Sequence, residues 1–187
     1  MNELRYEEKK KLRRKILDER RALTEEAIKE RSGKICDRFL ALPILSEASK
    51  VCIYMPINNE VDVSLMTDRL RSLGKTLYIP KVGGSSMHFH LYEPDTALSP
   101  GSFGILEPCD SPMLSADADT LIVMPGACFS EGRDRIGYGG GYYDRYIKKH
   151  PDVLTVAVAY DLQVLPEIPS AGHDQKPMIL LTETRQF

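Results

Sequence analysis

The sequence lacks the features that mark several large classes of protein. Its 187 residues carry a formal net charge of only −2, so no overall field attracts nucleic acid or an acidic membrane surface. No apolar run approaches the roughly 18 residues of a membrane span, and the charged start of the chain lacks the apolar core of a signal peptide. We therefore expect a cytoplasmic protein that binds neither nucleic acid nor membranes. Any anion it binds must be held by a local arrangement of residues.

Cysteines are few and widely spaced. The four, at positions 36, 52, 109 and 128, form no Cys-x-x-Cys pair. Neither a zinc site nor a dense disulfide framework is indicated, and reduced thiols are expected. Cys128 is interpreted as a buried thiol without a reactive role.

Repeats, low-complexity segments and evident linkers are also lacking. The length suits one domain, or one domain with a small appendage. We expect residues 1–187 to form a single domain, with the helices of residues 1–42 packed on it.

What is present is an alternation of helical and strand patterns. Helices are predicted over residues 3–21, from Thr24 to Pro43, over 62–74 and over 142–149. Strands are predicted at 50–55, 76–82, 87–93, 153–160 and 178–183, with a central one in "ADTLIVMPG", while residues 94–117 predict an ordered loop. Alternation with nearly continuous apolar strands predicts a layered α/β fold with a largely parallel sheet.

Each predicted helix has an apolar face that should be buried. The residues expected inside are Leu12, Ile16 and Leu17 in the first helix, Ile28, Ile35, Phe39 and Leu42 in the second, and Leu65, Met66, Leu70 and Leu73 in the third.

Three loops are predicted to share one edge of the sheet. They are "PINNE" after the first strand, the glycine-rich loop after "TLIVM", and "GHDQK" before the last strand. In open α/β sheets ligands gather beyond the carboxyl ends of the strands, so these loops are candidates for one site.

Glycines cluster in "PGACFSEGRDRIGYGGGYYDRY", from Pro125 to Tyr146. A tight strand-to-helix turn would need one or two residues with positive φ, and this cluster has more glycine than that. The alternative is a cradle of backbone N–H groups that binds a phosphate at the start of the next helix, with Arg133 and Arg135 adding charge. The pattern matches neither GxxxxGK[ST] nor GxGxxG.

Two aspartates accompany this loop. Asp144 either stabilises the dipole of the predicted helix or, with Asp174 in "GHDQK", binds Mg²⁺ beside a phosphate. His88 and His90 share one face of a predicted strand and could bind a metal, but no third ligand is evident. A half-exposed strand with two polar residues is the preferred interpretation for these histidines, and the role of His173 stays open.

Taken whole, "MPGACFSEGRDRIGYGGGYYDRYI" resembles the signature of the 5-formyltetrahydrofolate cyclo-ligase family. The resemblance extends to "KKKLRRKIL", "YMPINNEVDV", "PKV", "FGILEP" and "LPEIPSAGHD". It implies a single-domain, three-layer α/β/α sandwich with a helical N-terminus. It also implies ATP-dependent cyclisation of 5-formyltetrahydrofolate to 5,10-methenyltetrahydrofolate, with release of ADP and phosphate, through an imidate phosphate and with Mg²⁺.

The resemblance assigns roles by position. Lys9, Arg13 and Arg135 become the cations that act on ATP, and the ATP loop becomes Arg135, Ile136, Gly137, Tyr138, Gly139, Gly140, Gly141, Tyr142 and Tyr143. Folate falls on Met55, Glu60 and Phe103, together with Tyr138, Gly139, Gly140, Gly141 and Tyr142. Asp144 and Asp174 take the magnesium positions.

Two points of this assignment stay open. The basic pair could instead be Lys10 and Arg14, one residue further along. Some members of the family carry lysine where this chain has Gly140, which leaves more phosphate charge to Arg135, the basic pair and the metal.

Other functions are compatible with the residues alone. One is an ATP-independent sugar-phosphate isomerase or hydrolase that uses the loop for a substrate phosphate. Another is a non-catalytic regulator that binds folate or nucleotide. In every case the expected partners are small molecules, and we expect a monomer.

Overall fold

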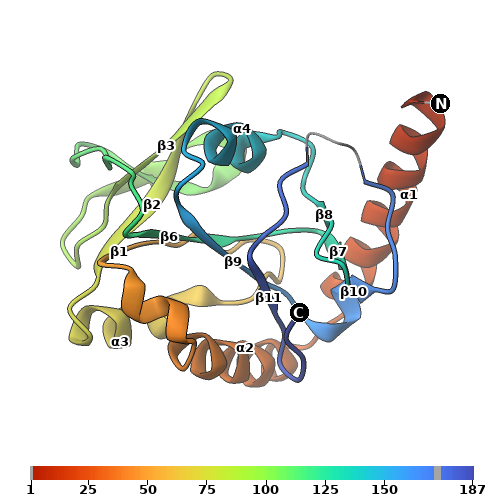
Figure 1. Cartoon of the computed structure of the whole chain (residues 1–187), viewed down its shortest axis with the longest axis horizontal. Coiled ribbons are helices and arrows are strands. Elements are labelled where there is room, and N and C mark those ends of the chain that lie inside the picture. Colours follow the sequence, from red (N-terminus) through yellow and green to blue (C-terminus); the bar gives the residue numbers. More distant parts are fainter. Residues whose placement is uncertain (1, 171–173) are drawn as a thin grey trace.

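A computed structural model describes residues 2–170 and 174–187, without the side chains of residues 2–5 and 103. Its centre is a six-stranded sheet with the strand order β11-β9-β6-β1-β2-β3 (Figure 1). These strands are β1 (Lys50–Cys52), β2 (Thr76–Gly83), β3 (Ser86–Leu91), β6 (Thr120–Met124), β9 (Leu154–Val158) and β11 (Ile179–Leu181). All neighbours pair in parallel except β2 and β3, which pair antiparallel. The predicted α/β fold with a largely parallel sheet is confirmed.

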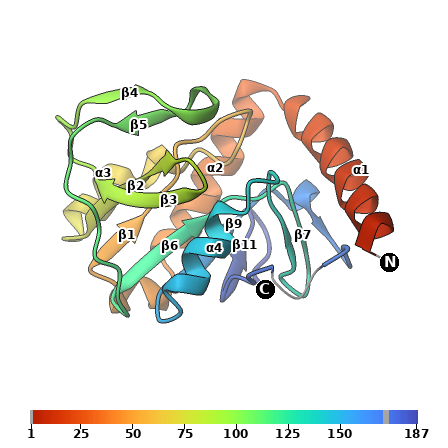
Figure 2. The same ribbon diagram turned by 90° about the horizontal axis from the view of Figure 1, so that it is seen from above.

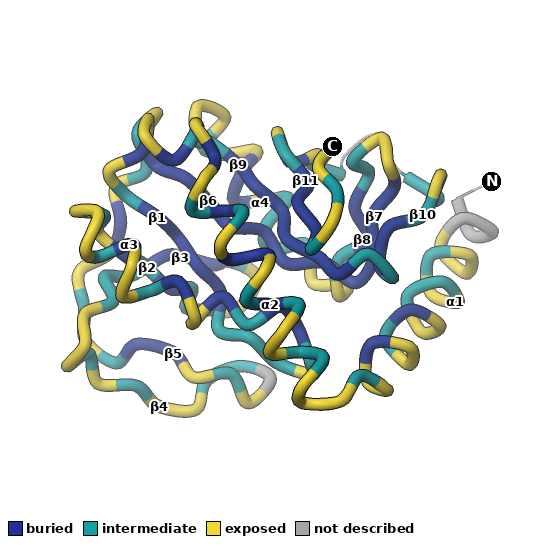
Figure 3. Tube along the Cα trace, turned by 90° about the horizontal axis from the view of Figure 1, so that it is seen from below, coloured by how far each residue is buried: buried dark blue, intermediate teal, exposed yellow. Residues whose placement is uncertain are grey.

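Helices cover both faces of this sheet (Figure 2). One face packs on α2 (Glu25–Leu40), η2 (Val63–Met66) and α3 (Thr67–Ser72), and the other on α4 (Tyr142–Lys149). Successive strand residues alternate between these two cores: Val51 and Val123 belong to the first, Cys52 and Met124 to the second. This is the period-two alternation expected of strands. The central strands β6 and β9 are almost wholly buried, whereas β2 and β3 at the sheet edge are only partly buried (Figure 3).

The first helix, α1 (Asn2–Arg21), lies against a second small sheet rather than the main one. That sheet has the order β10-β7-β8, from β7 (Cys128–Ser130), β8 (Arg135–Ile136) and β10 (Val164–Leu165). Ile16 of α1 packs with Cys128 and Ile136, so one apolar residue anchors the helix beside the glycine-rich loop.

The second helix begins as predicted. The side chain of Thr24 accepts a hydrogen bond from the backbone N–H of Ala27, which is an N-cap. Ile35 and Phe39 are buried as expected, and Ile28 is only half-buried.

The third predicted helix is shorter and less regular than expected. Asp62 caps it, as predicted, by accepting from the N–H of Ser64, but the first turn is the 3₁₀ segment η2. Met66 and Leu70 are buried, whereas Leu65 and Leu73 are 44% and 57% exposed. The prediction that these two leucines lie inside is wrong, because the 3₁₀ turn and the short helix present a narrower buried face than a regular α-helix over 62–74.

The remaining elements lie in segments predicted as loops. Residues 94–117 contain a two-stranded antiparallel sheet, β4 (Leu98–Pro100) and β5 (Leu106–Pro108), around η3 (Ser102–Gly104). Short 3₁₀ segments also occur as η1 (Pro43–Glu47) and η4 (Asp161–Gln163). Within the described ranges, no helix combines the length and the apolar character needed to span a bilayer.

Candidate active site

The glycine-rich loop joins β8 to α4, and its conformation requires glycine at two positions. Gly139 and Gly141 have φ of +107° and +65°, and Gly141 is the N-cap residue of α4. Side chains disfavour this region of φ, so the loop can bring bare backbone to the positive end of α4. The helix bounds 142–149 are those predicted, but the hairpin β7–β8 separates the loop from β6.

We expect Gly141→Ala to lower the free energy of unfolding by about 1–2 kcal/mol, because alanine is strained at positive φ. A Cβ there would also lie 2.7 Å from Nη1 of Arg145 and displace that side chain. The matched control is Gly33→Ala in α2, where a Cβ meets nothing within 4 Å. That change should raise stability by about 0.5–1 kcal/mol. Urea unfolding of both variants tests this; equal stability of Gly141→Ala and the parent would contradict it.

Arg135 and Asp144 form a buried ion pair at the start of α4. Nη2 of Arg135 lies 2.7 Å from Oδ1 of Asp144, and Nη1 donates to the carbonyl of Pro125 at 3.2 Å. Arg135 is 5% exposed, and its guanidinium lies 5.9 Å from the ring centre of Tyr143. Its Nε has no hydrogen-bond partner in the described part of the chain. The guanidinium is therefore fixed beside the loop.

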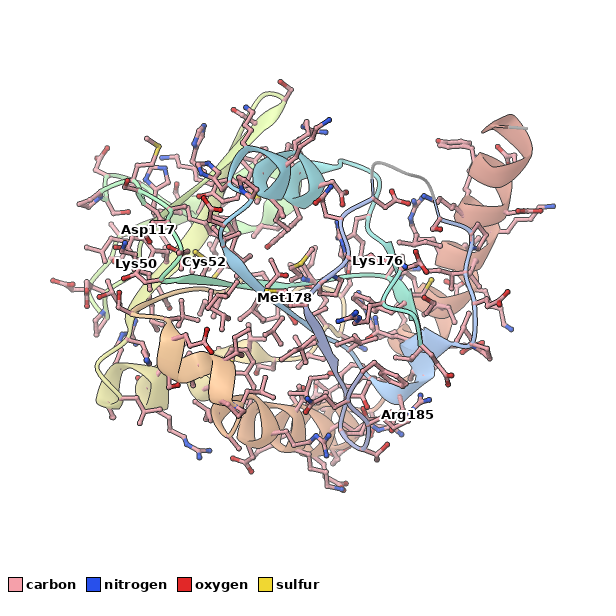
Figure 4. The ribbon with its side chains drawn as sticks, in the orientation of Figure 1. Lys50, Cys52, Asp117, Lys176, Met178 and Arg185 are labelled. Atoms are coloured by element: carbon pink, nitrogen blue, oxygen red, sulfur yellow. The ribbon has the colours of Figure 1, made fainter. Side chains whose placement is uncertain are left out.

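Arg133 differs from Arg135, although both were predicted to add charge for a phosphate. Arg133 donates to the carbonyl of Met178, and the nearby Lys176 pairs with Asp134 at 3.0 Å. The turn before β8 is thus tied to the segment leading into β11, where Figure 4 labels Lys176 and Met178. Arg133 supports this turn rather than the glycine loop.

One face of α1 reaches the loop. Nζ of Lys9 lies 2.5 Å from Oδ2 of Asp174, and Nε of Arg13 donates to the carbonyl of Gly137 at 2.8 Å. Lys10 and Arg14 are exposed. The geometry favours the register Lys9 and Arg13 over the alternative one residue further along.

Glu60 lies on the other side of the same loop. It is 6% exposed, and its carboxylate accepts hydrogen bonds from the hydroxyl of Tyr138 and, at 2.9 Å, from the N–H of Ile57. Burial raises the pKa of Glu60, against the opposing effect of these two donors and the charge of Arg20. Met55, which is close to Glu60 in the sequence, is partly buried against the main core. The side chain of Phe103 lies outside the described part of the structure.

Gly140 is closely covered by an aromatic ring. A Cβ at this position would lie 2.5 Å from the ring of Tyr142, whose hydroxyl donates to the carbonyl of Gly84 at 3.2 Å. Arg145 lies over the same ring at 5.0 Å from its centre. A lysine at position 140 would have to displace Tyr142. This chain therefore has an aromatic ring at the place where some members of the resembled family carry a lysine.

The two predicted metal ligands, Asp144 and Asp174, lie in segments that contact each other. The N–H of Gln175 donates to Oδ1 of Asp144 at 3.0 Å, which brings the residue next to Asp174 against α4. Mg²⁺ prefers oxygen ligands and is commonly held by one or two carboxylates plus phosphate oxygens. No group of three metal-binding side chains occurs among the described residues. Two carboxylates, however, match the number that commonly binds Mg²⁺ together with phosphate oxygens. His90 is engaged elsewhere, with Nδ1 2.8 Å from the carbonyl of Ser111, and His173 lies outside the described residues.

Arg20 is a site residue that the sequence analysis missed. It is 1% exposed and its Nη1 donates to the hydroxyl of Tyr138 at 2.7 Å. The signal was present, since Lys9, Arg13 and Arg20 lie at helical spacings on one face of α1 together with Ile16.

Comparison with known proteins identifies the family of the chain. A model of the 5-formyltetrahydrofolate cyclo-ligase family matches residues 5–183. A probable 5-formyltetrahydrofolate cyclo-ligase of Schizosaccharomyces pombe is 32% identical, with 86% of this chain and 87% of that protein covered. The mouse 5-formyltetrahydrofolate cyclo-ligase is 29% identical, with 90% of each covered.

A solved structure shows the same fold. The NMR structure of Aquifex aeolicus 5,10-methenyltetrahydrofolate synthetase superposes with a TM-score of 0.84 at 34% identity, covering 95% of this chain and 91% of that one. The chain belongs to the 5-formyltetrahydrofolate cyclo-ligase family.

Proposed function

We infer that this cyclo-ligase converts 5-formyltetrahydrofolate to 5,10-methenyltetrahydrofolate, at the expense of ATP, where the loop 135–143 meets α1 and the turn 57–60. The observation that carries this inference is the double contact of the loop. Its Gly137 carbonyl is held by Arg13, and its Tyr138 hydroxyl is held by Glu60. A single backbone segment thus joins a cationic region to a buried carboxylate, as a site for two dissimilar substrates requires.

The nucleotide belongs on the cationic side. Backbone N–H groups of Gly139, Gly140 and Gly141 and the start of α4 form an anion site, and Arg135 adds a fixed charge. Lys9 and Arg13 approach from α1. Phosphoryl transfer is catalysed mainly by positioning and by neutralising charge, so these groups suffice without a nucleophilic side chain.

The folate ring belongs beside Glu60. A carboxylate has about four acceptor sites, and the structure uses one on each oxygen, which leaves capacity for the N–H groups of a pterin. Met55, Tyr138 and Tyr142 supply apolar surface next to it, and Phe103 completes the proposed set.

The chemistry follows from the substrate. The formyl oxygen attacks the γ-phosphorus of ATP, so a P–O bond forms to that oxygen and ADP leaves. N10 then attacks the activated carbon, loses its proton, and the carbon–oxygen bond breaks with release of phosphate. Ring closure is intramolecular and gains from proximity within the substrate. Cys128 takes no part, since burial raises the pKa of its thiol to about 12.

Asp144 and Asp174 would hold Mg²⁺, which when bound neutralises charge on the phosphates. Arg135 and Lys9 each pair with one of these carboxylates and would orient it toward the nucleotide. The protein's own part is to fix both carboxylates by cations that also attract the phosphates.

The decisive experiment measures methenyl absorbance and phosphate release together. Methenyl formation and phosphate release should each require both 5-formyltetrahydrofolate and Mg·ATP. The two products should form in equal amounts. A sugar-phosphate isomerase or hydrolase would turn over without ATP, and phosphate release that ignores folate would count against the assignment. A binding regulator would take up both ligands and produce no absorbance.

Glu60→Gln should raise the Kd for 5-formyltetrahydrofolate at least tenfold, because the charge that accepts the pterin donors is lost; a hydrogen bond to a charged group is worth roughly 1.5–3 kcal/mol. The affinity for ATP should change little. Glu93→Gln is the control, since Glu93 is exposed. Calorimetric titration with each ligand separates the outcomes, and unchanged folate affinity in Glu60→Gln would refute the role.

Three sequence-based expectations complete the proposal. The chain forms one domain, acts as a monomer and works in the cytoplasm. Sedimentation of the purified protein tests the second. The relative from Arabidopsis thaliana is named mitochondrial, so localisation is best tested directly with a tagged full chain.

A further inference from the structure

The most deeply buried charge in the described chain belongs to Arg20, near the end of α1. Only 1% of this residue is exposed, and it heads the large side chains that are fully buried. Nε donates to the carbonyl of Asn58 at 3.1 Å, and Nη1 donates to the hydroxyl of Tyr138 at 2.7 Å. Nη2 has no hydrogen-bond partner among the described residues.

The hydroxyl of Tyr138 connects this guanidinium to Glu60. Arg20 can only donate, so the phenol oxygen accepts from it and directs its own proton elsewhere. That proton goes to Oε1 of Glu60. Arg20, Tyr138 and Glu60 therefore form one directed chain of hydrogen bonds from α1 to the proposed folate site, and reversing its direction would leave a donor facing a donor.

The turn that carries Glu60 is fastened to α1 on a second side. Asn58 and Asn59 have positive φ of 50° and 59°, which brings their backbone into a tight bend. The side-chain amide of Asn59 lies 3.3 Å from the carbonyl of Arg21 at the end of the helix. Arg20 thus bonds the carbonyl of Asn58 while Asn59 bonds the carbonyl of Arg21, so two contacts fasten the turn to α1.

The charge of Arg20 is balanced through the phenol. No carboxylate among the side chains that the structure describes lies within ion-pair distance of Arg20. Burying an unpaired charge is costly, and the nearest compensation is Glu60, one hydroxyl away. A lysine could not reproduce this arrangement, because a guanidinium offers several donors in a fixed plane and an ammonium is a point charge.

We propose that Arg20 is a positioning residue for folate binding: by fixing the hydroxyl of Tyr138 as a donor to Glu60, it holds the carboxylate of Glu60 aligned for the substrate's ring. This proposal rests on the proposed contact between Glu60 and folate. Arg20 itself touches no substrate.

The electrostatics around Glu60 give the direction of the pH effect. The groups facing it are Tyr138 and Arg20, Tyr54 before the turn, Tyr143 from α4, and Tyr160, whose hydroxyl donates to the Glu60 carbonyl at 3.0 Å. Burial raises the pKa of each of these four tyrosines, so they stay neutral at ordinary pH. Glu60 is the group that titrates, and Arg20 lowers its pKa.

Removing Arg20 should therefore raise the pKa of Glu60 further. Since the ionised form accepts the pterin donors, kcat/KM for folate should fall on the acid side, and this acid limb should move to higher pH. A role confined to stabilising the fold would lower the unfolding temperature and leave the limb in place.

The experiment compares four variants of the full chain: Arg20→Met, Tyr138→Phe, Glu60→Gln and Arg21→Met. For the first two, the acid limb of kcat/KM for 5-formyltetrahydrofolate should move upward by at least half a pH unit, with KM for folate raised and KM for ATP nearly unchanged. Tyr138→Phe removes only the hydroxyl, which keeps the test decisive if Arg20→Met folds poorly. Arg21→Met is the matched control on the same helical turn, because Arg21 is exposed and pairs with Asp18 at 3.1 Å.

The outcomes distinguish this inference from the assignment beneath it. If Glu60→Gln binds folate as the parent does, the proposed folate contact itself fails. If Glu60→Gln weakens folate binding while neither Arg20→Met nor Tyr138→Phe moves the acid limb, Arg20 is a structural residue and the inference is overturned. A shift of equal size in Arg21→Met would overturn it as well.

Discussion

Arg135→Met should lower kcat at least about 10³-fold, since a positioned arginine at a transferring phosphoryl group contributes on this scale. The guanidinium is buried at 5% exposure and held by the Pro125 carbonyl and by Asp144, so its charge is fixed before substrate arrives. Methionine fills a similar volume and supplies no charge. The affinity for 5-formyltetrahydrofolate should stay within a few-fold of the parent, because Glu60 and Tyr138 are untouched.

Two further variants isolate the charge from its geometry. Arg135→Lys keeps the charge but cannot hold both the Pro125 carbonyl and Asp144, so an intermediate loss is expected. Arg133→Met is the control in the preceding turn, since Arg133 bonds the carbonyl of Met178 instead. Rapid-quench measurement of ADP formation should show the defect in phosphoryl transfer. Near-normal ADP formation in Arg135→Met, or an equal loss in Arg133→Met, would refute the assignment.

Parts of the site could be read from local pattern because their geometry is local. Lys9 and Arg13 are four apart and so share a helical face, and both reach the loop region. The start of α4 follows from the glycine cluster that precedes it. The alternation of the sheet residues follows from the period of a strand.

Other parts depend on tertiary contacts that no local pattern contains. Strands β7, β8 and β10 are two or three residues long, too short to show a period. Asp174 precedes a strand, so the rule about carboxyl ends does not place it; it is placed by contacts of its segment with Lys9 and Asp144. Arg20 was missed because a charge at a buried helical position is rare unless it is paired, and its partner lies in the turn and loop rather than in the helix.

The same difference between regular and irregular backbone explains why the burial of two leucines was predicted wrongly. Leu65 and Leu73 satisfy a helical period, yet the period assumes a regular helix, and the capping Asp62 starts a 3₁₀ turn. Functional residues are thus best predicted where the backbone is regular, and least well where turns bring separate segments together.

Asp144→Ala should lower kcat at least about 100-fold and leave folate affinity largely intact, because the carboxylate is proposed to hold Mg²⁺ at the phosphates. The complication is that Asp144 also fixes Arg135, through the 2.7 Å contact. Asp174→Ala removes the second proposed ligand and leaves that ion pair in place, but it frees Lys9 from its 2.5 Å contact. Both variants should need a higher Mg²⁺ concentration for half-maximal activity, whereas a loss caused only by a displaced cation, Arg135 or Lys9, would not depend on Mg²⁺. Asp152→Ala, at an exposed position just beyond α4, is the control.

Binding of Mn²⁺ to the protein–ADP complex, followed by electron paramagnetic resonance, should weaken in Asp144→Ala and Asp174→Ala and not in Asp152→Ala. Unchanged Mn²⁺ affinity in Asp144→Ala and Asp174→Ala would show that these carboxylates serve the cations of the site and not a metal.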